Sequence, residues 1–174
     1  AISLNEDNKQ ESINPLSDEA KGIWDELKSV GYEGVKFKPE DLVFVGVRDT
    51  EKQEDELINR LNIKNLSVST IREKGIDFVL SEINNQLKKC DMIYVSFDVD
   101  SMDPDQVSYG TGTPVSGGLR VGEAEFLLSE LAKNDKTVCV EFVEVNPCLD
   151  NKKNKMAEVT FNLLKETTLK LSEN

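Results

Sequence analysis

The sequence predicts an α/β fold in which a parallel sheet carries helices on both faces. Four short apolar runs rich in β-branched residues occur along the chain, and each is followed by apolar residues at helical spacing. The runs are almost continuously apolar, which is typical of strands buried on both faces of a parallel sheet. Because ligands bind beyond the carboxyl ends of such strands, we look for a site in the residues that follow each run.

The first half of the chain opens this alternation. Ser17 starts a helix in which residues 20–27 place apolar side chains at i, i+3, i+4 and i+7. Residues 42–47 form a short apolar run and predict the first strand. Residues 57–61 indicate a short helix, and residues 66–69 a short second strand.

The second half continues it with longer elements and one long loop rich in Asp, Pro, Gly, Ser and Thr. In order, we expect a helix over residues 76–87, a strand over 92–97, a loop over 101–118, a helix over 124–131, a strand over 138–145 and a helix over 156–171. Right-handed crossovers would make all the strands parallel.

Composition limits the function classes. The 174 residues suit one domain, with residues 1–14 as an exposed polar loop or a cut segment and residues 15–174 as the domain itself. The net charge of −12 argues against a nucleic-acid partner and is compatible with a cationic substrate. We expect no membrane partner, because no apolar run approaches the roughly 20 residues of a span.

The cysteine and histidine content adds two limits. Three unpatterned cysteines favour a reducing compartment, the cytoplasm, and Cys139 lies inside an apolar run, where we expect a small core residue. The chain contains no histidine, so histidine catalysis and histidine metal ligation within this chain are excluded.

Acidic residues gather where the predicted strands end. They are Asp49, Glu51 and Glu54 after the first strand, Asp98, Asp100 and Asp103 after the third, and Glu144 at the end of the fourth. In a parallel sheet these acids converge on one edge, where unpaired carboxylates repel one another. A bound cation or a cationic substrate would relieve that repulsion.

Asp98 and Asp100 form the pair with the clearest metal-binding pattern. Alternation along a strand places both side chains on one face, where they could chelate one divalent cation or bridge two. The alternative is a turn in which aspartate accepts backbone hydrogen bonds. The glycines of residues 111–118 would let that loop approach a ligand closely, or serve a plain connection.

The remaining acids each have a structural alternative. Glu144 lies in an apolar run, so we expect it to be partly buried and to need a partner, either a ligand guanidinium or amine or a structural ion pair. Asp49 follows Arg48, and a local ion pair is its alternative. Glu51 and Glu54 could simply be solvated.

Four segments together resemble the arginase family of ureohydrolases. Ser-Phe-Asp-Val-Asp-Ser-Met-Asp-Pro at 96–104, Thr-Gly-Thr-Pro-Val-Ser-Gly-Gly-Leu at 111–119 and Glu-Phe-Val-Glu-Val-Asn-Pro at 141–147 are similar to the family's signatures. Val-Gly-Val-Arg-Asp at 45–49 resembles the strand that ends in substrate-binding acids. The order and spacing of the segments also fit. The resemblance implies a three-layer arginase-like fold, of which this chain would be the carboxyl-terminal part.

The resemblance implies roles for the acidic residues. Asp98 and Asp100 match two aspartates that hold a binuclear manganese cluster. Asp49, Glu51 and Glu54 match acids grouped around the substrate α-amino group. The family has aspartate where Glu51 stands, so the longer side chain would shift that contact.

The resemblance also implies a reaction. Glu144 matches the glutamate that receives the substrate guanidinium, and Thr113 the hydroxyl residue near the reacting carbon; both are the expected catalytic residues. The reaction would be the manganese-dependent hydrolysis of L-arginine to L-ornithine and urea, in which a metal-bridging hydroxide attacks the guanidinium carbon.

The chain departs from the family in its metal ligands. The family's histidine ligands and a proton-transfer histidine have no match here, so they would come from an upstream segment of the same protein. The isolated chain is therefore expected to be inactive. Family members commonly form homo-oligomers, with a trimer favoured here.

Three other interpretations remain open. The complete protein could be another amidinohydrolase, such as an agmatinase, although Asp49, Glu51 and the context of residues 114–115 favour arginase. The chain could be a catalytically silent interaction module, whose melting temperature manganese would leave unchanged. It could also be one section of a nicked enzyme, with the missing ligands on the other section.

Overall fold

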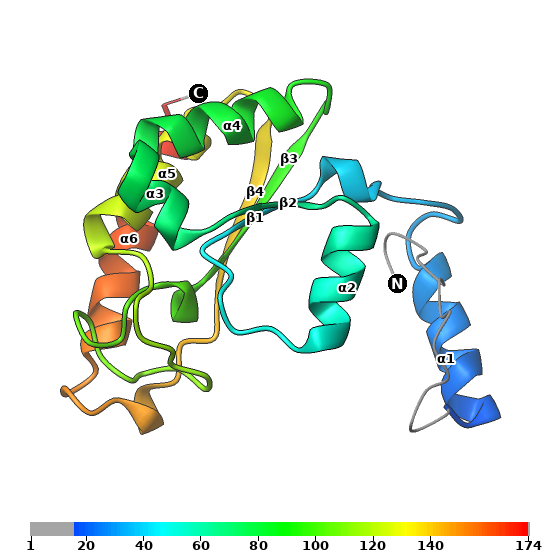
Figure 1. Cartoon of the computed structure of the whole chain (residues 1–174), viewed down its shortest axis with the longest axis horizontal. Helices are drawn as coiled ribbons and strands as arrows, with labels where there is room; N and C mark the ends of the chain where they lie inside the picture. Colours follow the sequence, from blue (N-terminus) through cyan, green and yellow to red (C-terminus); the bar gives the residue numbers. More distant parts are fainter. Residues whose placement is uncertain (1–15, 174) are drawn as a thin grey trace.

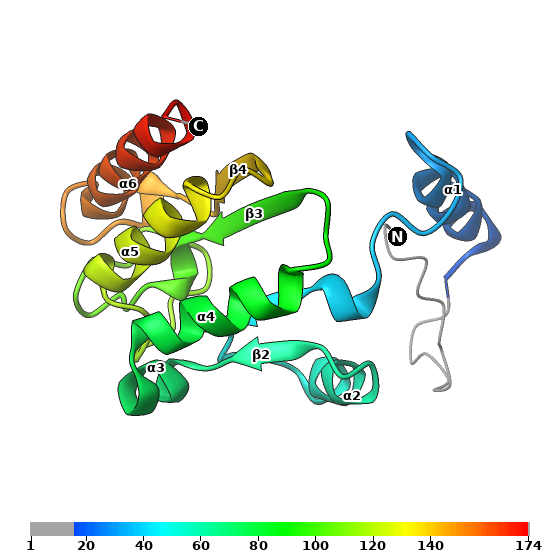
Figure 2. The same ribbon diagram turned by 90° about the horizontal axis from the view of Figure 1, so that it is seen from above.

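The computed structural model describes residues 16–173, so the polar segment 1–14 lies outside the described residues (Figures 1 and 2). The elements in chain order are α1 (Asp18–Ser29), η1 (Pro39–Asp41), β1 (Val43–Val45), α2 (Lys52–Arg60), β2 (Lys64–Leu66), α3 (Val68–Lys74), α4 (Ile76–Leu87), β3 (Ile93–Asp98), η2 (Val99–Ser101), α5 (Val121–Ala132), β4 (Thr137–Val143), η3 (Pro147–Leu149) and α6 (Lys155–Leu171). Strands and helices alternate along most of this order. The predicted α/β class is therefore confirmed.

The strands pair in parallel, as predicted, but they form two separate pairs. β1 pairs with β2, with Val43 opposite Lys64, and β3 pairs with β4, with Asp98 opposite Val143. Within the described residues no ladder joins β1 to β3, so the expectation of one continuous sheet is wrong for this part of the fold. The strands still point the same way, and their carboxyl ends lie on one side of the molecule (Figures 1 and 2).

Two hydrophobic clusters hold the pairs in place. The first packs α5 and α6 against β3 and the loop that follows it, through Phe97, Val99, Met102, Val107, Ala124, Leu128, Met156 and Leu163. The second joins β2, α3, α4 and α5 through Leu66, Ile71, Val79, Ile83, Leu119, Leu127 and Leu131. Each fully buried Val, Leu, Ile, Phe or Met side chain in these clusters contributes roughly 1.5–3 kcal/mol to folding. Because α5 contributes to both clusters, it fixes the β1–β2 pair relative to the β3–β4 pair.

The second strand is shorter than predicted and a helix replaces its end. The strand stops at Leu66, and Ser67 then caps α3 by accepting a hydrogen bond from the Thr70 amide at 3.2 Å. The prediction of a strand over residues 66–69 is therefore wrong beyond Leu66. The N-cap serine outweighs the β propensity of Val68, because it satisfies an amide at the start of the helix.

The first helix forms as predicted but buries no side chain. Ser17 caps α1 through a 3.1 Å hydrogen bond from the Ala20 amide, yet the predicted apolar stripe leaves Ile23 61% exposed. Figure 1 shows α1 apart from the rest of the molecule, at the end of the segment that leads to η1. The helix therefore gains little from tertiary packing, which normally stabilises helices of this length.

One face of the β3–β4 pair is uncovered in the described part of the chain. Tyr94 and Val138 on this face are more than half exposed, and Cys139, which pairs with Tyr94, is exposed as well. The expectation that Cys139 is a core residue is wrong, because the register shift between Ile93 and Tyr94 places Cys139 opposite exposed Tyr94. None of the helices between residues 16 and 173 is long and apolar enough to cross a membrane.

Candidate active site

The turn after β3 carries the two aspartates. β3 ends at Asp98, whose Oδ1 accepts a 3.0 Å hydrogen bond from the Asp100 amide, while the Ser101 hydroxyl donates to the Asp98 carbonyl at 2.6 Å. Val99, between the aspartates, is fully buried and anchors the turn in the first cluster. Asp98 thus caps the turn, as the structural alternative for this pair predicted. Asp98 Oδ1 is the oxygen used in this way.

The charges of Asp100 and Glu144 act on the carboxyl group of Asp98. Burial raises the pKa of the Asp98 carboxyl to about 6, the hydrogen bond from the Asp100 amide opposes that rise, and the charges of Asp100 and Glu144 add to it. Like charges raise a carboxyl pKa in this way only when they lie near one another. Asp100 and Glu144 therefore lie near enough to Asp98 to act on its carboxyl group.

Thr113 joins the site from the loop. Its hydroxyl donates a 2.8 Å hydrogen bond to Asp100 Oδ2, so the loop lies directly against the aspartate turn. A Cβ placed on the neighbouring Gly112 would stand 3.8 Å from Glu144 Oε2, which shows that the Glu144 carboxylate also faces this loop. The Asn146 backbone amide donates to the Gly110 carbonyl at 2.8 Å and ties the segment after β4 to the middle of the loop.

Glu144 itself differs from the prediction in its exposure. The side chain is exposed, so the expectation of partial burial is wrong, and the alternative of a structural ion pair with another described residue is not formed. Its backbone is in the left-handed region, with φ of 67°, which turns the side chain away from the apolar positions beside it. A glutamate pays for this conformation in free energy, and such strain is concentrated at functional sites.

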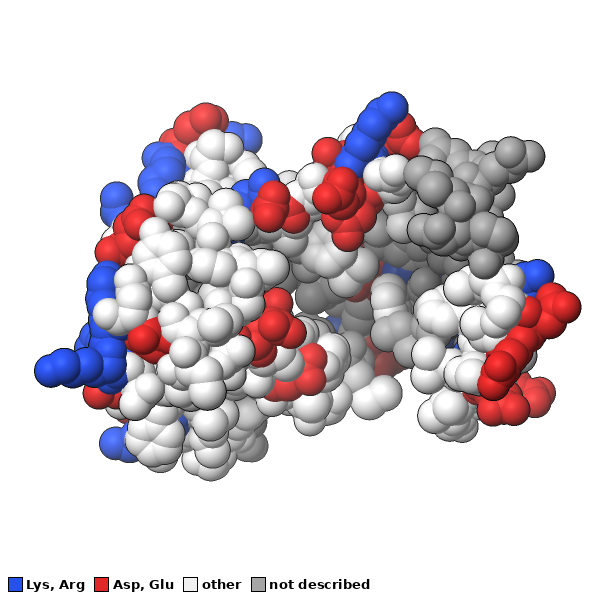
Figure 3. Space-filling view, turned by 90° about the horizontal axis from the view of Figure 1, so that it is seen from below, with Lys and Arg blue, Asp and Glu red and all other residues white. Residues whose placement is uncertain are grey.

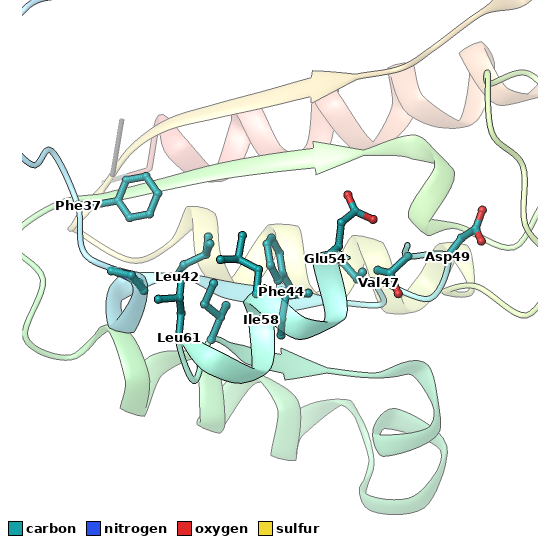
Figure 4. Close-up of a pocket in the computed structure, with 12 residues that line it drawn as sticks. Phe37, Leu42, Phe44, Val47, Asp49, Glu54, Ile58 and Leu61 are labelled. Carbon is teal, nitrogen blue, oxygen red and sulfur yellow. The ribbon is translucent and has the colours of Figure 1, made fainter. Parts of the chain in front are cut away.

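Two of the three acids after β1 line a separate pocket. Asp49 and Glu54 line a pocket of about 400 Å³ between β1 and α2, at one end, whereas Phe37 and Leu61 line the other end (Figure 4). One Glu54 oxygen accepts the Glu51 amide at 2.8 Å and caps α2. Asp49 is exposed and forms no hydrogen bond or ion pair with any other described residue. It is therefore free for a ligand amine.

Arg48 connects these acids to the aspartate turn, and the sequence interpretation missed this role. Its guanidinium donates to the Asp100 carbonyl at 2.8 Å and to the Val115 carbonyl at 3.1 Å from Nε. The expected alternative of an Arg48–Asp49 ion pair is not formed. The only signal in the sequence was an arginine at the end of a buried strand, which does not reveal which carbonyls the side chain meets.

The described residues do not form a complete metal site. Asp98 and Asp100 are two hard oxygen ligands of the kind that divalent cations bind, and their mutual repulsion favours a cation between them. Between residues 16 and 173, however, no group of three or more His, Cys, Asp or Glu side chains is arranged to hold a metal ion. A binuclear manganese cluster therefore does not fit these residues alone. Figure 3, viewed from the side of the strand-end loops, shows acidic side chains around a hollow.

Carboxylates gathered beyond the carboxyl ends of parallel strands define an α/β protein that binds its ligand at that edge. Residues 27–170 match the sequence model of the Arginase family, and the chain belongs to this family. An arginase of Brevibacillus brevis is 37% identical over 139 residues, which are 79% of this chain and 46% of that protein. An arginase of Staphylococcus aureus (strain MRSA252) is 38% identical over 130 residues, which are 74% of this chain and 42% of that protein.

The structural comparison agrees with the sequence match. The crystal structure of Helicobacter pylori arginase superposes with a TM-score of 0.82 at 32% identity, covering 91% of this chain and 52% of that one. The chain thus spans about half the length of the relatives it matches. The resemblance in the four motifs is confirmed at the level of the family.

Proposed function

We propose that the complete protein hydrolyses L-arginine to L-ornithine and urea in a manganese-dependent reaction, and that this chain supplies part of its active site. The observation that carries the proposal is the meeting of Asp98, Asp100, Thr113 and Glu144 at one sheet edge in a chain of the arginase family. The proposal concerns the complete protein, because the chain spans about half of its relatives' length.

Glu144 is the proposed acceptor of the substrate guanidinium. Its carboxylate is exposed, has no hydrogen-bond partner among the described residues and faces the loop that carries Thr113. A carboxylate accepts two parallel N–H bonds from a planar guanidinium, which orients the substrate as well as binding it. Thr113, held against Asp100, would then place its hydroxyl beside the guanidinium carbon.

Asp49, Glu51 and Glu54 are the proposed partners of the substrate α-amino group. All three are exposed at the carboxyl end of β1, and Asp49 has no competing partner within residues 16–173. Their combined negative charge attracts a cationic amine, most strongly at low ionic strength. Glu54 is partly committed to capping α2, so Asp49 would make the closer contact.

Asp98 and Asp100 are the proposed manganese ligands of this chain. Paired divalent cations supply a water that is activated near neutral pH, and two carboxylates do not hold such a pair. We propose that the remaining ligands come from the half of the relatives' length that this chain does not span. The isolated chain is accordingly expected to bind manganese weakly and to release no urea.

We also propose an assembly and a location for the complete protein. Residues 15–174 would form part of one domain, and the complete protein would be a homo-oligomer, with a trimer favoured, in the cytoplasm. The support is family membership. Light scattering of the purified complete protein measures its assembly, and a mass of one protomer would contradict that part of the proposal.

The test compares urea release by the isolated chain and by the complete protein, with and without manganese, on L-arginine and on agmatine. We expect the complete protein to require manganese and to prefer arginine, because the relatives it matches are arginases and agmatine lacks the α-carboxylate of arginine. Asp98→Asn in the complete protein should abolish turnover. Asp105→Asn, which changes an exposed carboxylate bonded to Tyr109, should leave turnover intact.

Three outcomes would contradict the proposal. They are robust turnover by the isolated chain, a preference for agmatine, and a complete protein whose melting temperature and activity do not respond to manganese. The last outcome would favour the interaction module, because a ligand that prefers the native state must stabilise it.

A further inference from the structure

Arg48 makes hydrogen bonds to backbone carbonyls from three segments of the chain. The side chain is half-buried at the carboxyl end of β1. The acceptors are the carbonyls of Gly46 at 3.3 Å, Asp100 at 2.8 Å, Ser101 at 3.4 Å, Met102 at 3.3 Å and Val115 at 3.1 Å. A guanidinium suits this position, because its five N–H donors lie in one rigid plane.

Residues 113–115 and residues 117–119 of the long loop are held by different contacts. In residues 117–119, the Leu119 amide donates to the Ser101 carbonyl at 2.8 Å and the Gly117 amide to Asp103 Oδ1 at 3.3 Å. In residues 113–115, the hydrogen bonds that connect the loop to the turn after β3 are those of Arg48 to Val115 and of Thr113 to Asp100. This part of the loop carries the proposed catalytic hydroxyl.

Asp100 is held at three points, and Arg48 supplies one of them. Its amide donates to Asp98 Oδ1 at 3.0 Å, its carbonyl accepts from Arg48 at 2.8 Å and its carboxylate accepts from Thr113 at 2.8 Å. Arg48 therefore binds the backbone of Asp100, whose carboxylate accepts the Thr113 hydrogen bond. It also binds the backbone of Val115, two residues after Thr113. Loss of the guanidinium would release both sides of that bond together.

We propose that Arg48 is a positioning residue that holds the Asp100 carboxylate and the Thr113 hydroxyl in register by bridging the turn after β3 and the loop at Val115. It does not itself touch the substrate. The structural part of this proposal stands on the contacts above, and its consequence for turnover rests on the proposed function.

Arg72 offers a matched control at the other end of the same loop. Its guanidinium donates to the Gly118 carbonyl at 3.2 Å and pairs with Glu123, and it forms no bond to the aspartate turn. Replacement of Arg72 thus removes a guanidinium from the loop without loosening Asp100 or Val115. Differences between variants at positions 48 and 72 isolate the bridge from a general loss of charge or packing.

The first experiment measures local order in the 174-residue chain. We expect Arg48→Met to speed amide exchange at Asp100, Met102 and Asp103 by about tenfold or more, with little change in α5 and α6, because opening is local. Backbone order parameters of residues 112–116 should fall below about 0.6, the range of flexible segments. Arg48→Lys should give an intermediate result, because an ammonium supplies three donors without the planar fork.

The control and the contrary results are equally specific. Arg72→Met should leave exchange at residues 100–103 and order at 112–116 unchanged. Uniformly faster exchange throughout the Arg48→Met chain, or no change at all, would overturn the proposal. Arg48→Lys keeps the charge and most of the packing, so it decides the question should Arg48→Met fail to fold.

The second experiment measures turnover by the complete protein well below its melting temperature. Arg48→Lys should lower kcat by roughly 10- to 100-fold, the cost of misplacing reacting groups by about 1 Å. KM for arginine should change by less than about twofold, because the acids that bind the substrate are untouched. Free guanidinium ion should restore part of the lost rate in Arg48→Ala, whereas in Arg72→Ala it should only compete with the substrate for Glu144.

The two experiments separate the possible failures. If the wild-type complete protein releases no urea, the proposed function is wrong, and the exchange and order parameters alone decide whether Arg48 forms the bridge. If the wild type is active and Arg48→Lys keeps its full kcat, the positioning role is wrong even though arginine hydrolysis stands.

Discussion

Thr113 Oγ1 donates a 2.8 Å hydrogen bond to Asp100 Oδ2 across a sequence separation of 13 residues. The bond joins two of the motifs that identify the family, the aspartate turn after β3 and the glycine-rich loop. It directs the threonine hydroxyl toward the acids of the site. The proposed metal ligand and the proposed catalytic hydroxyl therefore depend on each other for their positions.

We predict that Thr113→Val will weaken this dependence without unfolding the protein. The substitution removes one exposed, charge-assisted hydrogen bond, so the free energy of unfolding should fall by only about 0.5–1 kcal/mol. Arginine turnover by the complete protein should fall by roughly tenfold, since a catalytic group is lost from its position. Thr113→Ser keeps the hydroxyl and should retain most of the rate; equal losses in both variants would show that the methyl group, and not the bond, matters.

Much of the fold was predictable because its signals are local. The stripe over 76–87 and the apolar run of β3 predicted α4 and the strand that ends at Asp98. The missing signals are those of pairing between distant segments. The pattern within β1 and β3 is the same whether or not a ladder joins them, so the two separate pairs could not be foreseen.

Some features of the candidate site could likewise be predicted from the sequence, and others could not. The positions of Asp98 and Asp100 at a strand end were predictable from the sequence pattern, whereas Thr113 was singled out by the resemblance to the arginase family. The exposure of Glu144 was not, since its apolar neighbours suggest burial and only the positive φ turns it outward. The contacts of Arg48 were also hidden, because carbonyl acceptors belong to the backbone and are the same for every residue type.

We predict a pH dependence of stability that comes from Asp98 in metal-free protein. Its pKa is raised to about 6 from an ordinary 3.8, so the folded state binds the extra proton. The stabilisation is present at low pH and is lost as the pH rises through 6. Allowing for its partial exposure, the free energy of unfolding should fall by about 1 kcal/mol between pH 5 and pH 7 through this group.

Urea unfolding at pH 5 and pH 7 with a chelator present measures the effect. Asp98→Asn should remove that part of the pH dependence. Asp105→Asn should preserve it, because hydrogen bonds from Ser116 and Tyr109 lower the pKa of Asp105 and leave it ionised throughout this range. A wild-type slope of the opposite sign that disappears in Asp98→Asn would contradict the raised pKa.

We predict that Glu144→Gly will stabilise the chain and abolish arginine turnover. Left-handed backbone costs roughly 1–2 kcal/mol for an ordinary residue, and the added flexibility of glycine offsets about half of the gain. Denaturant unfolding should therefore show an increase of about 0.5–1 kcal/mol. Lys153, also exposed and with φ of 55°, is the matched control. Lys153→Gly should give a similar gain and keep the activity, whereas a loss of stability in Glu144→Gly alone would show that its side chain makes a stabilising contact.

Gly118 is the residue whose replacement should most directly separate the loop from the aspartate turn. A Cβ at Gly118 would lie 2.5 Å from the Ser101 carbonyl oxygen and 2.6 Å from the Met102 carbonyl carbon, both of them backbone atoms. Those atoms cannot move without breaking the Leu119–Ser101 hydrogen bond and disturbing fully buried Met102. Gly118→Ala should therefore lower the free energy of unfolding by about 1–3 kcal/mol, the usual cost of overpacking.

Gly122 in α5 has open space around its Cβ position, and Gly122→Ala should instead raise the free energy of unfolding by about 0.5 kcal/mol. Thermal unfolding of the two variants side by side tests the point, because both add one methyl group to the same stretch of chain. Equal effects would mean that the backbone approach at Gly118 does not hold the loop against the turn.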